Sequence, residues 1–163
     1  MYQNTIIWLR RDLRLYDNAA LFYALKGSNR VFPVFIFDTK ILSKLKNKKD
    51  RRIEFILRSL AEIKKTLNEN GSDLIVEMGD PELLIPKLIS EYKCNSLYIN
   101  RDYEKYAQDR DQTISKILLN KKVTTFTFKD QVLFESDEIL TQSNNPYTVF
   151  TPYKNNHLKR LNE

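Results

Sequence analysis

Residues 8–21, which read WLRRDLRLYDNAAL, decide the fold of this chain. The stretch follows an apolar run, Ile6-Ile7, that predicts the end of a buried strand. Asp17-Asn18 before Ala19-Ala20-Leu21 predicts a capped helix. The charged residues between strand and helix are therefore expected at the mouth of a site.

Working outward, apolar runs of strand length alternate with helical patterns. Strands are predicted at 5–9, 31–37, 73–77, 96–99 and 123–128, and helices near 17–26, 52–69, 81–92 and 104–119. This alternation predicts an α/β fold, a doubly wound, Rossmann-like, five-stranded parallel sheet with helices on both faces. Gly71 should end the helix at 52–69, and Pro86 should bend or shorten the helix that Asp80-Pro81 begins.

Ligands of such sheets bind beyond the carboxyl ends of the strands. The segments there are residues 10–14, 38–41, 79–80, 100–103 and 129–130, which are rich in charge and poor in glycine. Neither a dinucleotide fingerprint nor a Walker loop occurs, so a phosphate cradle is not predicted.

The pattern changes after residue 129. Large apolar residues recur without a clear period among Pro146, Pro152 and several asparagines. We therefore predict a domain at 1–129 and an extended, irregular interdomain linker at 130–163, whose apolar side chains must pack on something.

Composition narrows the class of protein. A chain of 163 residues that is 42% hydrophobic supports one compact domain. A lone Cys94 forms no internal disulfide, and the apolar run before residue 10 is too short for a signal peptide or a membrane span, which predicts a cytoplasmic location. The net charge of +6 favours a polyanionic partner. The densest basic cluster is read as a solvated face in preference to a DNA contact: Lys44, Lys46, Lys48, Lys49, Arg51 and Arg52.

Taken residue by residue, the polar motifs have two interpretations. Residues 10–14 are either a salt-bridged strand exit, the commoner case, or a site where arginine binds an anion or stacks on a ring. Residues 100–104 are either an ordinary loop with a helix cap or a second polar group at the site. His157 and Cys94 are too few for zinc, and Asp109 and Asp111 fall on different helix faces, so we predict no metal site and no catalytic acid–base pair.

The pattern W-x-R-R-D-L-R-L-x-D-N-x-A-L resembles the opening of the DNA photolyase and cryptochrome family. Further matches follow in the family's order, with Lys105 replacing a proline: Val34-Phe35-Ile36-Phe37-Asp38, Ile41-Leu42, Arg52, Phe55, Ser59-Leu60, Gly79-Asp80-Pro81, Asn100-Arg101-Asp102-Tyr103-Glu104, Tyr106-Ala107, Arg110-Asp111, Leu133-Phe134, Ile139-Leu140 and Pro146-Tyr147-Thr148-Val149-Phe150-Thr151-Pro152-Tyr153.

The resemblance implies the light-harvesting domain of a deoxyribodipyrimidine photolyase. In that family an N-terminal α/β domain binds an antenna chromophore, and a separate helical domain holds FAD and the damaged DNA, whose target base is flipped out. The implied partners are that helical domain and, through it, DNA containing cyclobutane pyrimidine dimers. By itself the chain is expected to lack flavin and repair activity, and its uncovered face could support a dimer.

The resemblance also bears on the chromophore. Folate-binding members carry Asn-Glu where this chain has Tyr106-Ala107, which favours an 8-hydroxy-5-deazaflavin or a flavin over methenyltetrahydrofolate. The residues that the resemblance implies for its binding are Arg11, Phe37, Asp38, Ile41, Arg52, Asp102, Tyr103 and Arg110.

Two alternatives remain open. A cryptochrome-type photoreceptor shares the domain but signals instead of repairing DNA. A freestanding nucleotide-binding module has a similar layout, although the missing glycine loop argues against it.

Overall fold

A computed structural model describes residues 1–47 and 50–162. Five strands form one sheet, in which every neighbouring pair is parallel. They are β1 (Tyr2–Leu9), β2 (Ser28–Asp38), β3 (Ile75–Gly79), β4 (Ser96–Asn100) and β5 (Thr124–Phe128). Their order is β3-β2-β1-β4-β5, so the chain winds outward to β3 and then returns to the other side of β1. The predicted doubly wound sheet is confirmed, and its direction of winding reverses between β1 and β4.

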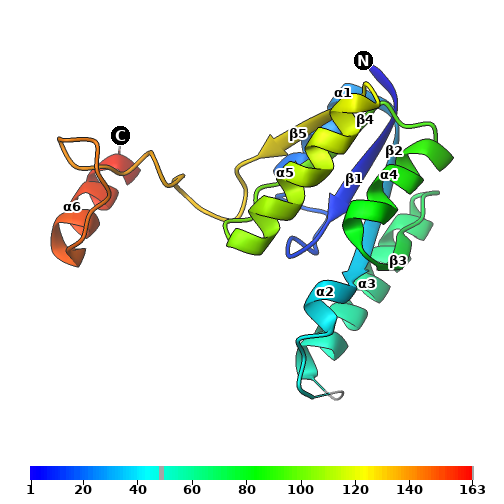
Figure 1. Cartoon of the computed structure of the whole chain (residues 1–163), viewed down its shortest axis with the longest axis horizontal. Coiled ribbons are helices and arrows are strands. Elements are labelled where there is room, and N and C mark those ends of the chain that lie inside the picture. The colour runs from blue at the N-terminus through cyan, green and yellow to red at the C-terminus, as the bar shows by residue number, and fades with distance from the viewer. Residues whose placement is uncertain (48–49, 163) are drawn as a thin grey trace. The chain divides into compact units, whose positions relative to one another are not determined.

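Helices cover both faces of the sheet (Figure 1). The elements are α1 (Ala19–Gly27), α2 (Thr39–Leu42), α3 (Arg51–Glu69), α4 (Pro81–Glu91) and α5 (Lys105–Asn120). One apolar cluster joins β1 and β2 to α1 and α3, and a second joins the opposite face of the same strands to α4 and α5. The strands β1 and β4 are buried on both sides, as expected for a sheet covered by helices.

Asparagine and aspartate side chains begin most of these helices. Asn18 Oδ1 accepts a hydrogen bond of 3.0 Å from Leu21 N, and Asp80 Oδ1 accepts one of 3.0 Å from Glu82 N, as the sequence predicts. Asp38 is the last residue of β2 and also caps α2. Pro86 is buried inside α4, which continues through it to Glu91. Of the predicted basic cluster, Lys48 and Lys49 lie outside the described residues.

Gly71 ends α3 in the left-handed region, with φ of 73°. Ser72 N donates to Leu67 O at 2.9 Å and Gly71 N donates to Asn68 O at 3.1 Å, the pattern of a Schellman motif. A Cβ at Gly71 would meet no atom within 4 Å, so only the backbone conformation opposes a side chain there.

We therefore expect Gly71→Ala to lower the free energy of unfolding by about 1 kcal/mol, the cost of left-handed backbone for an L-residue. Gly71→Asn should cost less, because asparagine tolerates this conformation. Urea unfolding followed by circular dichroism measures both variants. Equal losses for alanine and asparagine would contradict the backbone explanation.

Residues Val132–Glu163 form a second compact unit, separate from Met1–Gln131. Within its described part, a helix, α6 (Phe150–Leu161), follows an irregular segment. The sequence pattern does not predict this helix. Pro152 suggests a break, but it lies in the first helical turn, where its missing N–H needs no helical partner. His157 packs against Phe134 and Tyr153, with ring centroids 4.9 and 5.7 Å apart, which fixes α6 on its own unit.

Candidate functional site

A hollow of about 310 Å³ opens at the carboxyl ends of β1 and β2. It lies next to the point between β1 and β4 where the winding of the sheet reverses, and Asp102 and Glu104, which follow β4, complete its lining. Ligands of such sheets bind at this end of the strands. Helices α2, α3 and α5 contribute its walls, which the domain's own side chains leave unfilled. Most of the lining is apolar: Trp8, Phe35, Ile36, Phe37, Ile41, Leu42, Leu45, Ile53, Ile56 and Ala107. Its volume is at the lower end of the range for sites that enclose an organic ligand.

Seven of the eight residues singled out in the sequence line this hollow: Arg11, Phe37, Asp38, Ile41, Arg52, Asp102 and Arg110. Tyr103, the eighth, is not among the lining residues. The tyrosine in the lining is Tyr106, in the first turn of α5. Residues Tyr106 and Arg110 are four apart and share a helix face, a spacing in the sequence that could have identified Tyr106.

The rim of the hollow carries two ion pairs formed by Arg11. Arg11 Nε lies 3.3 Å from Asp102 Oδ2, and Arg11 Nη2 lies 2.6 Å from Glu104 Oε1. The hydrogen bond to Glu104 raises the pKa of Arg11. Because the Arg11 side chain is 56% exposed, these pairs contribute little stability and its guanidinium remains accessible to a ligand. Arg11 and Asp102 therefore lie on the same side of the opening.

Arg52 occupies another part of the rim. Its Nη2 lies 2.6 Å from Asp50 Oδ2, and the hydrogen bonds that Arg52 donates lower the pKa of Asp50 to about 2. The arginine side chain is exposed, so this pair also leaves its charge available at the opening.

A buried ion pair lies deeper in the hollow. Arg110 Nη1 is 3.3 Å from Asp38 Oδ2, and both side chains are only 5% exposed. Asp38 also accepts hydrogen bonds from Tyr106 Oη at 2.8 Å and from Lys40 N at 2.9 Å. Arg110 Nη2 contacts Asp111 Oδ1 at 3.0 Å on its other side. With further partners on α2 and α5, this pair is held in one arrangement.

Trp8 is the largest aromatic residue of the lining, and it is 1% exposed. Within residues 1–47 and 50–162, its buried Nε1–H has no hydrogen-bond partner. The guanidinium carbons of Arg10 and Arg110 lie 5.0 and 4.6 Å from the Trp8 ring centroid. The sequence places Trp8 at a strand end but gives no sign that two cations converge on it.

Burial and the hydrogen bond to Asp38 raise the pKa of Tyr106 to about 12, so its phenol stays neutral at physiological pH. An unfolded tyrosine titrates near pH 10, so between about pH 10 and 12 the folded chain binds the proton more tightly than the unfolded chain. Stability should fall with pH across that interval, and Tyr106→Phe should reduce the slope. Chemical unfolding of both proteins at several alkaline pH values measures how the free energy of unfolding changes with pH. Identical slopes for the two proteins would contradict a raised pKa at Tyr106.

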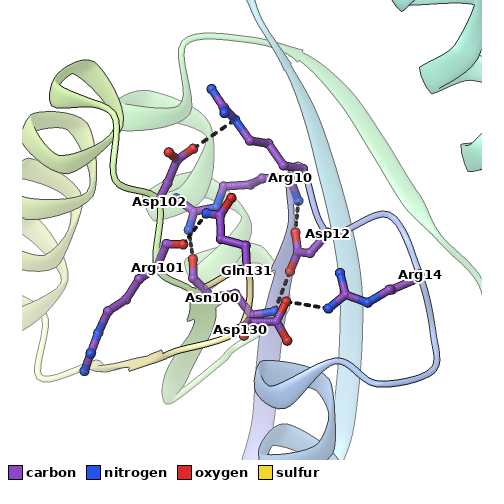
Figure 2. Close-up of a pocket in the computed structure, with 9 residues that line it drawn as sticks. Arg10, Asp12, Arg14, Asn100, Arg101, Asp102, Asp130 and Gln131 are labelled. Carbon is purple, nitrogen blue, oxygen red and sulfur yellow. Dashed lines mark hydrogen bonds and ion pairs between the residues drawn. The ribbon is translucent and has the colours of Figure 1, made fainter. Parts of the chain in front are cut away.

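The turn between β1 and α1 is held by a buried polar network (Figure 2). Asn100 Nδ2 donates to Asp12 Oδ2 at 2.6 Å and to Asn18 Oδ1 at 2.9 Å, and Asn100 Oδ1 accepts from Ala20 N at 2.9 Å. Asp12 Oδ1 accepts from Arg10 N at 2.7 Å. One side chain from β4 thus joins the strand exit to the first turn of α1.

The four charged residues of this turn divide into two groups. Arg14 Nη2 pairs with Asp130 Oδ2 at 2.7 Å, and Asp12 belongs to the Asn100 network, so both stabilise the turn (Figure 2). Arg10 and Arg11 instead line the hollow. The salt-bridged strand exit predicted for residues 10–14 is therefore present, because Arg10, Arg11 and Arg14 all form ion pairs. A binding role for Arg10 and Arg11 stays a prediction.

Other reactive groups lie apart from the hollow. Cys94 is buried, and desolvation raises its pKa to about 12, so the thiol is protonated at neutral pH. Among the residues that the structure describes, no group of three or more His, Cys, Asp or Glu side chains is placed to hold a metal ion. No helix in the same part of the chain is long and apolar enough to cross a membrane.

The sequence profile of the family described as DNA photolyase matches residues 5–163. The chain belongs to the DNA photolyase family. A deoxyribodipyrimidine photo-lyase from Synechococcus is 34% identical over 151 residues, which are 93% of this chain and 31% of that protein. The chain thus spans about a third of this relative, as expected for the family's N-terminal domain.

Two solved photolyase structures share the fold. The crystal structure of a bacterial class III photolyase from Agrobacterium tumefaciens superimposes with a TM-score of 0.82 at 30% identity, over 93% of this chain and 31% of the other. An archaeal photolyase from Sulfolobus tokodaii is described with two FAD molecules and with the implication of a novel light-harvesting cofactor. It superimposes with a TM-score of 0.75 at 32% identity, over 94% of this chain and 34% of the other.

Proposed function

We propose that this photolyase domain binds a planar antenna chromophore of the deazaflavin or flavin type in the hollow. The observation that carries the proposal is the hollow itself, an unfilled space with apolar walls at the predicted edge of the sheet. Phe37 and Ile41 would form walls against the ring, Arg11 and Asp102 would meet its polar edge, and Arg110 would lie beneath it. When bound, the chromophore supplies light absorption, and the domain contributes shape and polarity.

Charge supports this class of ligand. Among the residues that the structure describes, four arginines and three carboxylates, Asp38, Asp102 and Glu104, line the hollow, so positive charge in this lining is in excess by one. A ring with a single anionic group, such as 8-hydroxy-5-deazaflavin, suits that balance. The Sulfolobus tokodaii photolyase, a relative of this chain, is described with two FAD molecules, which supports a flavin as a candidate ligand here. Folate is disfavoured, because Ala107 offers no polar group and the Tyr106 hydroxyl already donates to Asp38.

In the full-length protein, we propose that light energy passes from this chromophore to FAD in a helical domain, which repairs cyclobutane pyrimidine dimers in DNA. Family membership and the deoxyribodipyrimidine photo-lyase from Synechococcus support this proposal. The partners are then the helical domain and, through it, damaged DNA.

Dimerisation of the isolated domain and a cytoplasmic location stay predictions. A repair assay on the full-length protein with dimer-containing DNA tests the activity, and a protein that responds to light without repair would be a photoreceptor.

Absorbance titration of the purified chain tests chromophore binding. We expect saturable binding of 8-hydroxy-5-deazariboflavin or flavin mononucleotide, with a shifted absorption band, and weaker binding of methenyltetrahydrofolate. Tight binding of an adenine nucleotide, with no response to flavins and deazaflavins, would favour the freestanding nucleotide-binding module instead.

Ala107→Phe should weaken chromophore binding about tenfold or more, because the added ring occupies the hollow and overpacking costs about 1–3 kcal/mol. Leu119→Phe is the matched control, since Leu119 is an exposed residue of the same helix that does not line the hollow. Absorbance titration measures both affinities. Equal affinities for the two variants would place the chromophore elsewhere.

A further inference from the structure

Trp8 combines a place in the lining of the hollow with an unusual electrostatic setting. Arg10 and Arg110 place guanidinium carbons 5.0 and 4.6 Å from the indole centroid. Asp111 forms an ion pair with each of these arginines, and Asp38 holds Arg110 from another direction at 3.3 Å. Two cations are thus fixed over one oxidisable ring beside the space where a chromophore would sit.

An indole near an excited flavin or deazaflavin is ordinarily a quencher. With such a chromophore bound and excited, the indole would give it one electron and would become a radical cation. Return of the electron restores both ground states and releases the photon's energy as heat. A light-harvesting chromophore works only when its excited state outlasts this loss, so an aromatic donor in the lining is a liability.

The arginines oppose the first electron transfer. A cation over the face of a neutral indole is attracted by the ring's quadrupole, but it repels the same ring once the ring carries a positive charge. Burial strengthens this repulsion, because charges interact more strongly away from water. Asp111 and Asp38 offset part of it, so the effect depends on the guanidinium groups being the charges in contact with the ring. Within the described part of the chain, Nε1–H also has no hydrogen-bond acceptor, so no side chain is placed to take its proton directly.

We propose that Arg10 and Arg110, positioned by Asp111, keep Trp8 from quenching a chromophore excited in the hollow. The proposal rests on the proposed function, because it concerns the same site. It assigns the two arginines a part in preserving the excited state, separate from any contact with the ligand.

A first test needs no chromophore. Trp8 is the only tryptophan of the chain, whereas there are nine tyrosines that oxidise in a similar range of potential. In protein film voltammetry, the indole signal is therefore the oxidation wave that Trp8→Phe removes. The potential should fall in Arg10→Gln and in Arg110→Gln. Arg10→Gln leaves the Asp38–Arg110 pair in place, so the test stands even when Arg110→Gln does not fold. An unchanged potential in Arg10→Gln would overturn the proposal.

A second test uses bound 8-hydroxy-5-deazariboflavin. Its fluorescence lifetime should shorten several-fold in Arg10→Gln and Arg110→Gln, with the indole radical cation visible by transient absorption. Adding Trp8→Phe to either variant should restore the lifetime. Arg58→Gln, which removes an exposed charge of α3 outside the hollow, should leave it unchanged.

The outcomes separate the two proposals. Absence of binding appears first in the absorbance titration and counts against the proposed function, and the protective role falls with it. When the chromophore binds, lifetimes unaffected by the arginine substitutions would overturn the protective role alone. A longer lifetime in Trp8→Phe than in the unchanged chain would do the same, because it would show that Trp8 quenches despite its two cations.

Discussion

Arg110→Met should lower the free energy of unfolding by about 3–5 kcal/mol, the usual cost of leaving one member of a buried ion pair unpaired. Asp38 would keep the hydrogen bonds from Tyr106 Oη and Lys40 N but would lose the only cation that pairs with it among the described residues. Urea unfolding of the variant at neutral pH measures the loss.

The double variant Asp38→Asn/Arg110→Met is the control for that prediction. With both charges removed, no unpaired ion remains in the buried site, and most of the lost stability should return. A double variant that is no more stable than Arg110→Met would show that packing around Arg110, and not its charge, supports the site.

Asn100→Ala should cost about 3 kcal/mol, because one truncation leaves several buried groups without partners. Asp12 loses a donor, Asn18 Oδ1 loses another, and Ala20 N–H loses its acceptor. Chromophore binding should weaken as well, since the same turn positions Arg10 and Arg11. Urea unfolding and the absorbance titration measure the two effects.

Asn95→Ala provides the comparison, because Asn95 is exposed and precedes β4 at the opposite edge of the sheet. A surface substitution of this kind should change stability by no more than about 0.5 kcal/mol. If Asn100→Ala proved equally mild, the network in Figure 2 would not be what holds the turn.

The sheet was predictable from the sequence because each strand is marked by its own apolar run between helical patterns. The start of β2 was not predictable in the same way. The apolar pattern begins at residue 31, whereas the strand begins at Ser28, directly after α1. A Cβ at Gly27 would lie 2.8 Å from Tyr98 Oη, so a side chain at the join would have to displace the tyrosine. Tyr98 is 71 residues further along the chain, so this close contact leaves no local signal.

The site was predictable in its position and less so in its composition. Strand-end residues such as Arg11 and Asp102 are visible in the sequence, because parallel strands bring their carboxyl ends to one edge. Trp8 and Tyr106 were missed, because their roles depend on which helix face meets the edge of the sheet. The sequence does not tell which charged residues of 10–14 stabilise the turn and which line the hollow. That distinction depends on their partners, such as Asn100 on β4 and Asp130 after β5.

The indole Nε1–H resonance of Trp8 gives the most direct test that the hollow is where a chromophore binds. One tryptophan gives one such signal in a proton–nitrogen correlation spectrum, and an aromatic ligand shifts only nearby protons. Titration with 8-hydroxy-5-deazariboflavin or flavin mononucleotide should move this signal in step with the absorbance change, while the amide of Leu119 stays in place. Binding seen by absorbance with an unmoved Trp8 signal would contradict the proposed site.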